Sequence, residues 1–337
     1  MIKKFIFVII ALLSCNATFA QDNLSIVYIH IGPSFPKHLL ESIRQVRLHN
    51  PNEDVYICGN AEALRKDKKH LSFLKVKGIP IETLPKSDQH ISFLKRTSFT
   101  EDFWIRTTER LLIAHELIKQ QNLENVFHIE SDVMIYDSFR DMLPIFTQLY
   151  PSMAIPFAND YAAICSLVFL KDEKAASLMA DCIDRHAPEG QNDMRLPGIL
   201  KEEMGTSVID HLPILPPSYV ENTDQKDFVS KWAPKTDNKF DYCKHFESFS
   251  CIFDAVTFGT LLSRKDGSFC EGTIFDPRGF NIIWKKNNHN LYVPYVQYNG
   301  FECRICNLHI HAKNLQDFRS DKRSPPLAWV NRTFVNN

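Results

Sequence analysis

Glycine, net charge and long apolar segments are all scarce in this sequence of 337 residues. Its 11 glycines are too few for collagen-like or low-complexity structure. Its 39 basic and 40 acidic side chains give a formal net charge of −1, so no basic excess points to nucleic acid as a partner. After the N-terminus no segment approaches the roughly eighteen apolar residues of a membrane span, and no internal repeat is visible. The sequence therefore reads as an ordinary globular chain, in one large domain or two smaller ones.

The N-terminus is the exception to this lack of apolar runs. Two lysines precede an apolar run over residues 5–13, and Thr18-Phe19-Ala20 places small residues at a cleavage position. The pattern predicts a secretory signal peptide over residues 1–20, because the run is short for a transmembrane helix. Two alternatives are an uncleaved membrane anchor over residues 5–20 and a bacterial lipoprotein with a lipobox around Cys15. No stable membrane span is expected once the signal is removed.

Cysteine usage agrees with export. Removal of Cys15 leaves eight of the nine cysteines, and an even count after an export signal permits disulfides whose pairing the sequence does not reveal. Five cysteines crowd the C-terminal third and are the expected bridge formers: Cys243, Cys251, Cys270, Cys303 and Cys306. The last two have zinc-like spacing, but no second pair is spaced like one, so structural zinc is not expected.

Strand and helix patterns alternate along the first half of the chain. Apolar periodicity and turn residues predict strands over 25–31, 54–58 and 79–84 and helices over 37–48 and 100–121. Further strands are expected from 126, over 153–156 and over 163–170, then a helix over 173–185. Irregular loops and short helices are expected over residues 188–241. A helix is expected over 252–259, and a pair of strands over 291–298 and 302–309. This order predicts an α/β fold with a parallel sheet.

Two carboxylates stand where the apolar strand from Val126 should leave the sheet. Side chains two residues apart on an extended strand share a face, so Glu130 and Asp132 would lie about 6–7 Å apart. Ligands of open α/β sheets bind beyond the carboxyl ends of the strands, and Mg²⁺ or Mn²⁺ is typically held there by carboxylates. We expect Asp132 to be a metal ligand rather than a solvated turn acid.

With this motif the chain resembles the GT-A, or nucleotide-diphospho-sugar transferase, class of glycosyltransferases. That class has a strand-end Asp-x-Asp motif, of which Glu130-Ser131-Asp132 is a Glu-x-Asp variant. The helix containing Phe103-Trp104 and Arg110 and the later block over residues 252–259 also match. The resemblance covers about residues 25–318 and is uneven over 188–241.

The resemblance implies a GT-A-like, Rossmann-like fold with a mostly parallel central sheet flanked by helices. We expect a single large domain over residues 21–325, followed by a loose tail over 326–337. Its nucleotide-binding half would cover about residues 21–136, and its acceptor-side half about 137–325.

A late motif adds two histidines and a lysine to the candidate site. His309 and His311 leave a strand two residues apart and would share a face. By analogy with metal-dependent GT-A enzymes, the resemblance implies that one of these histidines binds the metal and that Lys313 binds phosphate. The alternative is a pair of strand histidines with no ligand. Glu130 is either a second metal ligand or a ribose contact.

The remaining candidates each have a structural alternative. Arg110 would meet the diphosphate or the sugar, or form an ion pair; His30 and Gly32 would meet the nucleotide, or form a turn. Asp254 would be a general base or sugar contact, or a helix cap. Asp160 would meet the donor sugar, or belong to a loop turn.

These residues predict a metal-dependent glycosyltransferase that uses Mn²⁺ or Mg²⁺. It would move a sugar from a nucleotide-diphosphate donor to a hydroxyl of a glycan, a glycoprotein or another acceptor. The alternative is a noncatalytic protein on the same fold that binds a glycan or a nucleotide sugar. A glycoside hydrolase fits less well, because its two acids must flank a bond from opposite sides. Together with the export signal, a transferase fits an ER or Golgi lumen or a secreted protein.

Overall fold

The computed structural model of the chain describes residues 23–232, 236–264 and 268–322. The expected signal peptide over 1–20 and the expected tail over 326–337 lie outside these ranges. Within the described part of the chain, no helix is both long and apolar enough to cross a membrane.

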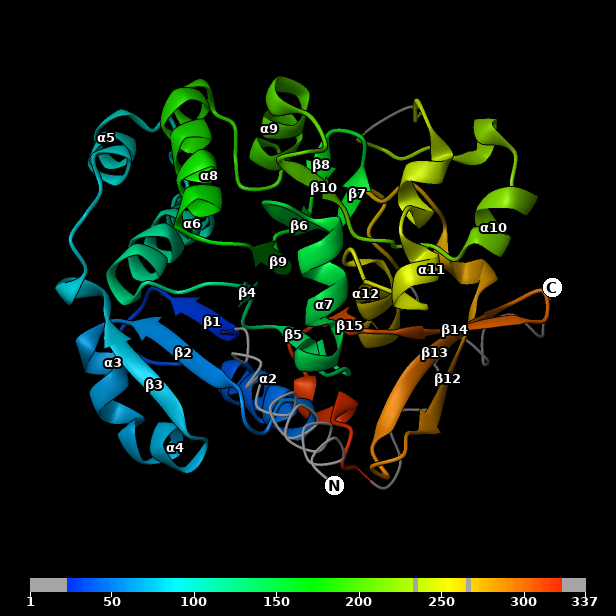
Figure 1. The fold of residues 1–337 in the computed structure, drawn as a ribbon, viewed down its shortest axis with the longest axis horizontal. Helices are drawn as coiled ribbons and strands as arrows, with labels where there is room; N and C mark the ends of the chain where they lie inside the picture. The colour runs from blue at the N-terminus through cyan, green and yellow to red at the C-terminus, as the bar shows by residue number, and fades with distance from the viewer. Residues whose placement is uncertain (1–22, 233–235, 265–267, 323–337) are drawn as a thin grey trace, which may run out of the picture.

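A seven-stranded sheet forms the centre of the fold (Figure 1). Its strands in spatial order are β10 (Ile209–His211), β6 (Met153–Ile155), β9 (Leu167–Leu170), β4 (Val126–Ile129), β1 (Ser25–His30), β2 (Asp54–Gly59) and β3 (Val76–Pro80). All neighbours are parallel except at β9, which runs antiparallel to both β4 and β6. The predicted, mostly parallel α/β sheet is confirmed. Because β1 and β4 are parallel, their carboxyl ends meet at one edge of the sheet.

Helices cover both faces of this sheet, because its strands are apolar on both sides. One face packs against α5 (Asp88–Arg96), α6 (Asp102–Gln121), α8 (Glu173–His186) and α9 (Leu196–Met204). The other packs against α2 (Lys37–His49), α3 (Ala61–Lys66), α4 (Lys68–Phe73) and α7 (Phe139–Leu149). Alternation along β1 shows the arrangement: Val27 and Ile29 join the first core, whereas Ile26 and Tyr28 join the second.

A smaller sheet with its own core follows in the C-terminal part. Its order is β11 (Cys251–Ile252), β14 (Phe301–Ile305), β13 (Tyr292–Tyr298) and β12 (Asn281–Lys286). The helices around it are α10 (Pro217–Asn222), α11 (Phe246–Phe249) and α12 (Thr257–Ser263). A third apolar cluster, rich in aromatic side chains such as Phe258, Phe275 and Phe280, fills the space beneath this sheet. Short 3₁₀ turns are η1 (Ile81–Thr83), η2 (Ala187–Glu189), η3 (Gln225–Asp227), η4 (Lys239–Cys243), η5 (Pro277–Gly279) and η6 (Leu315–Phe318).

Two short ladders complete the fold. β7 (Phe157–Asn159) pairs with β8 (Ala162–Ala163), and β5 (Val133–Ile135) pairs antiparallel with β15 (Asn307–His309). The second ladder joins the strand region after β4 to the C-terminal part, with His309 opposite Val133.

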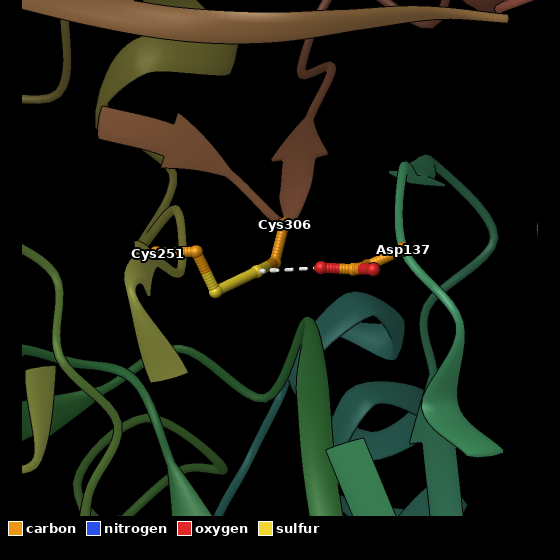
Figure 2. Close-up of side chains that lie close together, drawn as sticks. All are labelled: Asp137, Cys251 and Cys306. Atoms are coloured by element: carbon orange, nitrogen blue, oxygen red, sulfur yellow. Dashed lines mark hydrogen bonds between the residues drawn. A yellow bond between two sulfur atoms is a disulfide. The ribbon is translucent and has the colours of Figure 1, made fainter. Parts of the chain in front are cut away.

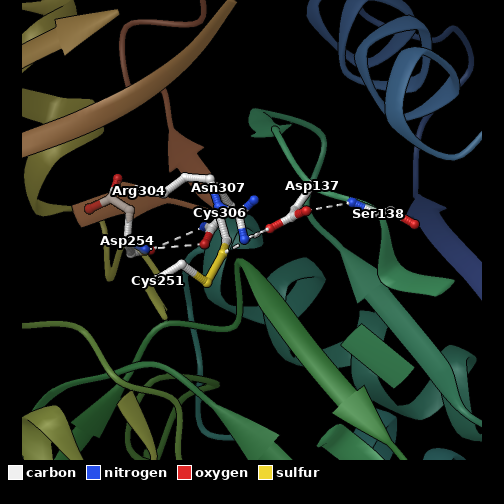
Figure 3. Close-up of a disulfide and its surroundings, with 7 residues drawn as sticks. All are labelled: Asp137, Ser138, Cys251, Asp254, Arg304, Cys306 and Asn307. Atoms are coloured by element: carbon white, nitrogen blue, oxygen red, sulfur yellow. Dashed lines mark hydrogen bonds and ion pairs between the residues drawn. A yellow bond between two sulfur atoms is a disulfide. The ribbon is translucent and has the colours of Figure 1, made fainter. Parts of the chain in front are cut away.

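A disulfide between Cys251 and Cys306 lies beside this ladder (Figure 2). Of the five cysteines expected to form bridges, these two do so, while Cys243, Cys270 and Cys303 are free thiols. The Asp137 carboxylate lies 3.6 Å from the Cys306 sulfur and pairs with Arg304 at 2.6 Å (Figure 3). Because both sulfurs are used in the bond, this cluster offers no thiolate to a metal.

Five predicted elements differ from the structure. The strands predicted over 163–170 and 302–309 are each divided, into β8 and β9 and into β14 and β15. The third strand ends at Pro80, and residues 81–83 form a 3₁₀ turn, because a proline cannot donate to the ladder. The block over 252–259 is not one helix: β11 ends at Ile252 and α12 begins only at Thr257, with Asp254 capping it. The extended segment from Val126 to Tyr136 is broken by a turn. In addition, β10 and β12 lay where no strand was expected.

Close packing of α12 on β15 leads to a test at Gly259. A Cβ there would lie 2.1 Å from the backbone oxygen of His309 and 2.5 Å from its carbonyl carbon. Gly to Ala in an open helix stabilises by about 1 kcal/mol, but this clash is with backbone and should reverse the sign. We expect Gly259→Ala to lower the free energy of unfolding by about 3 kcal/mol, measured by urea denaturation.

Gly279 provides the matched control. A Cβ there meets only Tyr298 Cε2 at 4.0 Å, so Gly279→Ala should change stability by less than about 0.5 kcal/mol. Equal stability of the two variants would show that α12 does not need its glycine.

Candidate functional site

A cavity of about 630 Å³ opens at the carboxyl edge of the central sheet. Its lining includes the α6 face, the turn after β4, the end of β15 with the segment that follows it, and residues of α12 and of the loops around it. The α6 residues include Trp104, Thr107 and Arg110. The cavity thus joins segments from both halves of the chain, and it contains most of the acids and cations expected from the sequence.

Glu130 and Asp132 enter this cavity from a turn, not from an extended strand. β4 ends at Ile129, and the Val133 N–H donates to the Glu130 carbonyl at 3.3 Å, which closes the turn. The Glu130 N–H donates to the Ser166 carbonyl at 3.0 Å and fixes its start. The expectation of a shared strand face was therefore wrong in its geometry, although both carboxylates line the same cavity.

His309 reaches Asp132 because β15 pairs with β5. The Ile310 N–H donates to the Asp132 carbonyl at 2.8 Å, which extends that ladder to the turn. His309 Nε2 then lies 3.4 Å from Asp132 Oδ1 and 3.8 Å from Glu130 Oε2. His309 Nδ1 is buried and has no hydrogen-bond partner among the described residues.

Asp254 supports His309 from behind the cavity. Its carboxylate accepts backbone N–H groups from His309 at 3.0 Å, Gly259 at 2.8 Å, and residues 257 and 258. Asn307 also exchanges hydrogen bonds with the Asp254 backbone (Figure 3). Asp254 is 1% exposed and does not line the cavity, so both carboxylate oxygens serve as a helix cap. The hypothesis of a general base or sugar contact at Asp254 is not supported by this placement.

The three side chains Glu130, Asp132 and His309 fit a divalent cation. Each offers one ligand atom, and these atoms lie within 4.8 Å of one another. Two carboxylate oxygens and one imidazole nitrogen suit Mn²⁺ or Mg²⁺. His311 stands outside this set: it is exposed on the rim, with its ring centre 6.4 Å from that of His309.

Opposite charges hold this set of side chains together. Burial alone would raise the pKa of Asp132, but the His309 imidazolium and the Lys313 ammonium together bring it well below its ordinary value. Burial would lower the pKa of His309, yet Asp132 and Glu130 raise it to about 9. A proton on the imidazole therefore occupies the position of positive charge that a cation would take.

Arg110 links the turn to an acid that the sequence did not single out. Its guanidinium lies 2.5 Å from Glu130 Oε1 and 3.8 Å from Asp193 Oδ2. Asp193 also accepts from the Thr107 hydroxyl at 3.1 Å. Burial raises the pKa of Asp193 to about 6 despite the neighbouring Arg110. Asp193 was missed because residues 188–241 show no periodicity, and no local signal marks it.

The rim of the cavity is basic on one side. Lys313, His311 and Arg264 line it, and all three come from the C-terminal part of the chain. His38 from α2 lies behind the turn, with its Nε2 3.3 Å from the Ser131 hydroxyl. Lys313 lies close enough to help lower the pKa of Asp132, and its contact with phosphate stays a prediction.

Another part of the cavity wall is aromatic. Phe103 and Trp104 meet edge to face at 4.9 Å at the start of α6, and Trp232 lies 48% exposed. A Cβ at Gly272 would lie 2.2 Å from the Trp232 ring, so the indole rests directly on glycine backbone. Thr260 also lines the cavity, and its buried hydroxyl has no partner among the described residues.

Besides Asp254, three predicted site residues lie outside the cavity. His30 ends β1 and its Nε2 lies 2.9 Å from the Ser34 carbonyl oxygen. Gly32 lines a second hollow of about 360 Å³ and donates its N–H to Asn60 at 2.7 Å. Asp160 accepts from the Thr236 hydroxyl at 2.7 Å, the residue 237 N–H and the Tyr242 hydroxyl, which fixes a loop. The expected donor-sugar contact at Asp160 is not supported by this placement.

Comparisons with known proteins find only remote structural likeness. No protein-family model and no curated protein matches the chain. Among solved structures it is similar to mouse xyloside xylosyltransferase 1 in its apo form, at 8% identity, over 64% of this chain and 94% of that one, with a TM-score of 0.44. It is similar to the galactosyltransferase LgtC in complex with donor and acceptor sugar analogues (11% identity, 59% and 78% covered, TM-score 0.40). It is also similar to a cytidylyltransferase from Leptospira borgpetersenii, at 10% identity, over 57% of this chain and 76% of that one, with a TM-score of 0.35. All three TM-scores lie below 0.5, and none of these likenesses carries an argument about activity.

The raised pKa of Asp193 predicts a pH-dependent stability. In the folded state the Asp193 carboxyl keeps its proton up to about pH 6, whereas the ordinary pKa of an aspartic acid is 3.8. Stability from the protonated acid is therefore present below pH 3.8 and is lost as the pH rises through 6. An asparagine there does not titrate, so the stability of Asp193→Asn relative to the parent should rise by about 2–3 kcal/mol from acid to neutral pH.

Urea denaturation in EDTA across that pH range measures this difference. A constant difference between variant and parent would mean that the pKa of Asp193 is the same in the folded and unfolded states.

Proposed function

We propose that this protein is a metal-dependent glycosyltransferase that uses a nucleotide-diphosphate sugar as donor. The observation that carries the proposal is the convergence of Glu130, Asp132 and His309 on one point, with Lys313 on the rim of the same cavity. Two carboxylates and an imidazole suit a bound metal cation. The Lys313 ammonium beside them suits the diphosphate whose charge that metal would neutralise.

The charges around the cavity support a diphosphate as ligand. Lys313 and Arg264 line the cavity near the His311 imidazole, and both cations can face phosphate oxygens there. Lysine offers a point charge and arginine a planar fork, and both are common phosphate partners. Arg110 is held by Glu130 and Asp193, so it is fixed in place rather than free to follow the ligand.

A bound Mn²⁺ or Mg²⁺ would stabilise charge on the leaving nucleotide diphosphate. Asp132, Glu130 and His309 would hold that cation. Asp254 orients His309 through the backbone, and Arg110 keeps one oxygen of Glu130 occupied, which leaves the other toward Asp132 and His309. The chain's contribution is thus a prearranged ligand set in a partly enclosed site.

The aromatic wall is the part of the cavity that suits the sugar and the acceptor. Trp104 and Trp232 present flat apolar surfaces to the cavity. Three carboxylates line the cavity among the described residues. If Glu130 and Asp132 hold the cation, Asp193 stays available to accept a proton. An inverting reaction needs a carboxylate to accept the proton of the acceptor hydroxyl, and neither Asp254 nor Asp160 faces the cavity.

The acceptor that we propose is a hydroxyl of a glycan, a glycoprotein or a related molecule. Export through residues 1–20 into a secretory lumen or out of the cell stays a prediction from the sequence. The Cys251–Cys306 bond is compatible with such an oxidising compartment.

Replacing Asp132 tests the proposed activity. Asp132→Asn keeps the shape of the side chain but removes a charged ligand, so metal-dependent turnover should fall at least about 100-fold. The measurement is release of nucleotide diphosphate from a panel of UDP- and GDP-sugars with Mn²⁺. EDTA should abolish the activity of the parent to the same extent.

Asp141→Asn is the matched control, because Asp141 is an exposed acid at the start of α7, outside the cavity. It should retain parental turnover. Parental turnover in Asp132→Asn, together with a parent whose turnover is insensitive to EDTA, would contradict the proposed metal dependence.

Calorimetry separates the enzyme from a noncatalytic glycan-binding protein. UDP or GDP should bind the parent in the presence of Mn²⁺ and lose at least about tenfold in affinity without it. His309→Ala should show the weaker affinity in both conditions, since it lacks one of the three ligands. Binding of a free glycan together with no metal-dependent binding of either nucleotide would favour the noncatalytic alternative.

A further inference from the structure

The helical pair α3 and α4 presents a positively charged surface that lies apart from the cavity. The pair connects β2 to β3, the edge strand of the central sheet, at the end of the molecule far from the smaller sheet (Figure 1). Residues 61–77 contain six Lys or Arg against two Asp or Glu, in a chain whose formal net charge is −1. This segment is therefore charged oppositely to the rest of the chain.

Phe73, the last residue of α4, is exposed on this surface. The other apolar side chains of the pair pack inward, with Ala63, Leu71 and Leu74 between 0% and 7% exposed. Phe73 is 80% exposed, the highest value among the large apolar side chains of the described residues. Leaving a phenylalanine in water forgoes the gain of burying it, so a partner that covers Phe73 would recover that gain.

The cations next to Phe73 are free to meet an external anion. Lys68, Lys69 and Lys75 are exposed, and none makes an ion pair or a side-chain hydrogen bond within the described chain. The two acids of the segment are already engaged, Glu62 by Lys66 at 2.7 Å and Asp67 by His70 at 3.3 Å. The surface therefore has unbalanced positive charge around one apolar side chain.

A hollow of about 440 Å³ continues the surface toward α2. It is lined by Phe73 and Lys75 together with Arg44 and Arg319. The two arginines share Glu41, at 2.7 and 3.3 Å, and Arg319 also pairs with Asp321. Most of the unpaired charge therefore belongs to the three lysines, and the hollow adds space beside them.

We propose that this α3–α4 surface docks the protein on an anionic lipid bilayer. Lysines attract acidic headgroups, and a protruding aromatic side chain inserts at the boundary between headgroups and acyl chains. A protein partner fits less well, because a stable interface needs about 800 Å² per partner with an apolar centre. Phe73 offers only one large apolar side chain, surrounded by long mobile cations.

Vesicle binding tests this docking. The full chain is sedimented with vesicles of phosphatidylcholine alone, or of phosphatidylcholine and phosphatidylglycerol in equal parts. The parent should bind the anionic vesicles, and added salt should weaken binding because screening shortens the reach of the lysines. The triple variant Lys68→Glu, Lys69→Glu and Phe73→Ser should bind them at least about tenfold more weakly, since each lysine contributes about fivefold or more.

A second triple variant serves as the matched control. Lys95→Glu, Lys119→Glu and Phe240→Ser makes the same chemical changes at exposed positions elsewhere, where Phe240 is 50% exposed. It should bind within about twofold of the parent. All three proteins carry the same N-terminal residues 1–20, so any affinity of that segment for lipid is common to them, and circular dichroism checks that each is folded.

A tryptophan at position 73 gives an independent measurement. Bromine-labelled lipids should quench the fluorescence of Phe73→Trp beyond the quenching of the parent's own tryptophans. Equal vesicle binding by the parent and the first triple variant, or no added quenching at position 73, overturns the proposal. A change of sedimentation mass on Phe73→Ser without vesicles would instead assign the surface to contact between copies of this chain. Neither result affects nucleotide release, so the proposed activity and this docking fail separately.

Discussion

The pairing of β5 with β15 is the interaction on which the candidate site depends. It sets His309 opposite Val133, one residue from Asp132, and so places an imidazole from the C-terminal part against a turn of the central sheet. The neighbouring contacts all reinforce it: α12 packs on the β15 backbone because Gly259 lacks a side chain, and Asp254 accepts N–H groups from both elements. A buried carboxylate is tolerated there because four backbone donors replace the water that it has lost.

Much of the fold was predictable from local patterns. Strands buried on both faces appear as short apolar runs, so those beginning at Ser25, Asp54 and Val126 were placed at their observed starts. The helix over 173–185 was predicted because its apolar residues repeat at helical spacing. In the structure it ends one residue later. The same reasoning singled out Asp132, since a carboxylate at the end of an apolar strand is conspicuous against its neighbours. For the histidine ligand the resemblance left His309 and His311 open, and only the structure distinguishes them.

Residues whose roles depend on distant partners were not predictable. For Asp254 and Asp160 the sequence offered the observed helix cap and loop role only as alternatives to a site role. The N–H and O–H groups that decide between them come from other segments, which the sequence does not display. Asp193 belongs to the site but lies in a stretch with no periodicity, so only the folded chain brings it to Arg110. Trp232 becomes a wall of the cavity because Gly272, forty residues further on, lets its ring lie on the backbone.

The order of the site residues along the chain has a consequence for synthesis and folding. Arg110, Glu130 and Asp132 leave the ribosome well before β15 exists, and during that time the two acids lack their imidazole. Burying a carboxylate without its partner is costly, so we expect the turn after β4 to stay hydrated while the central sheet assembles around it. The nascent N-terminal half would then be a scaffold with no cation site. Competence to bind metal would arise in a late step, when the segment around His309 docks and expels that water.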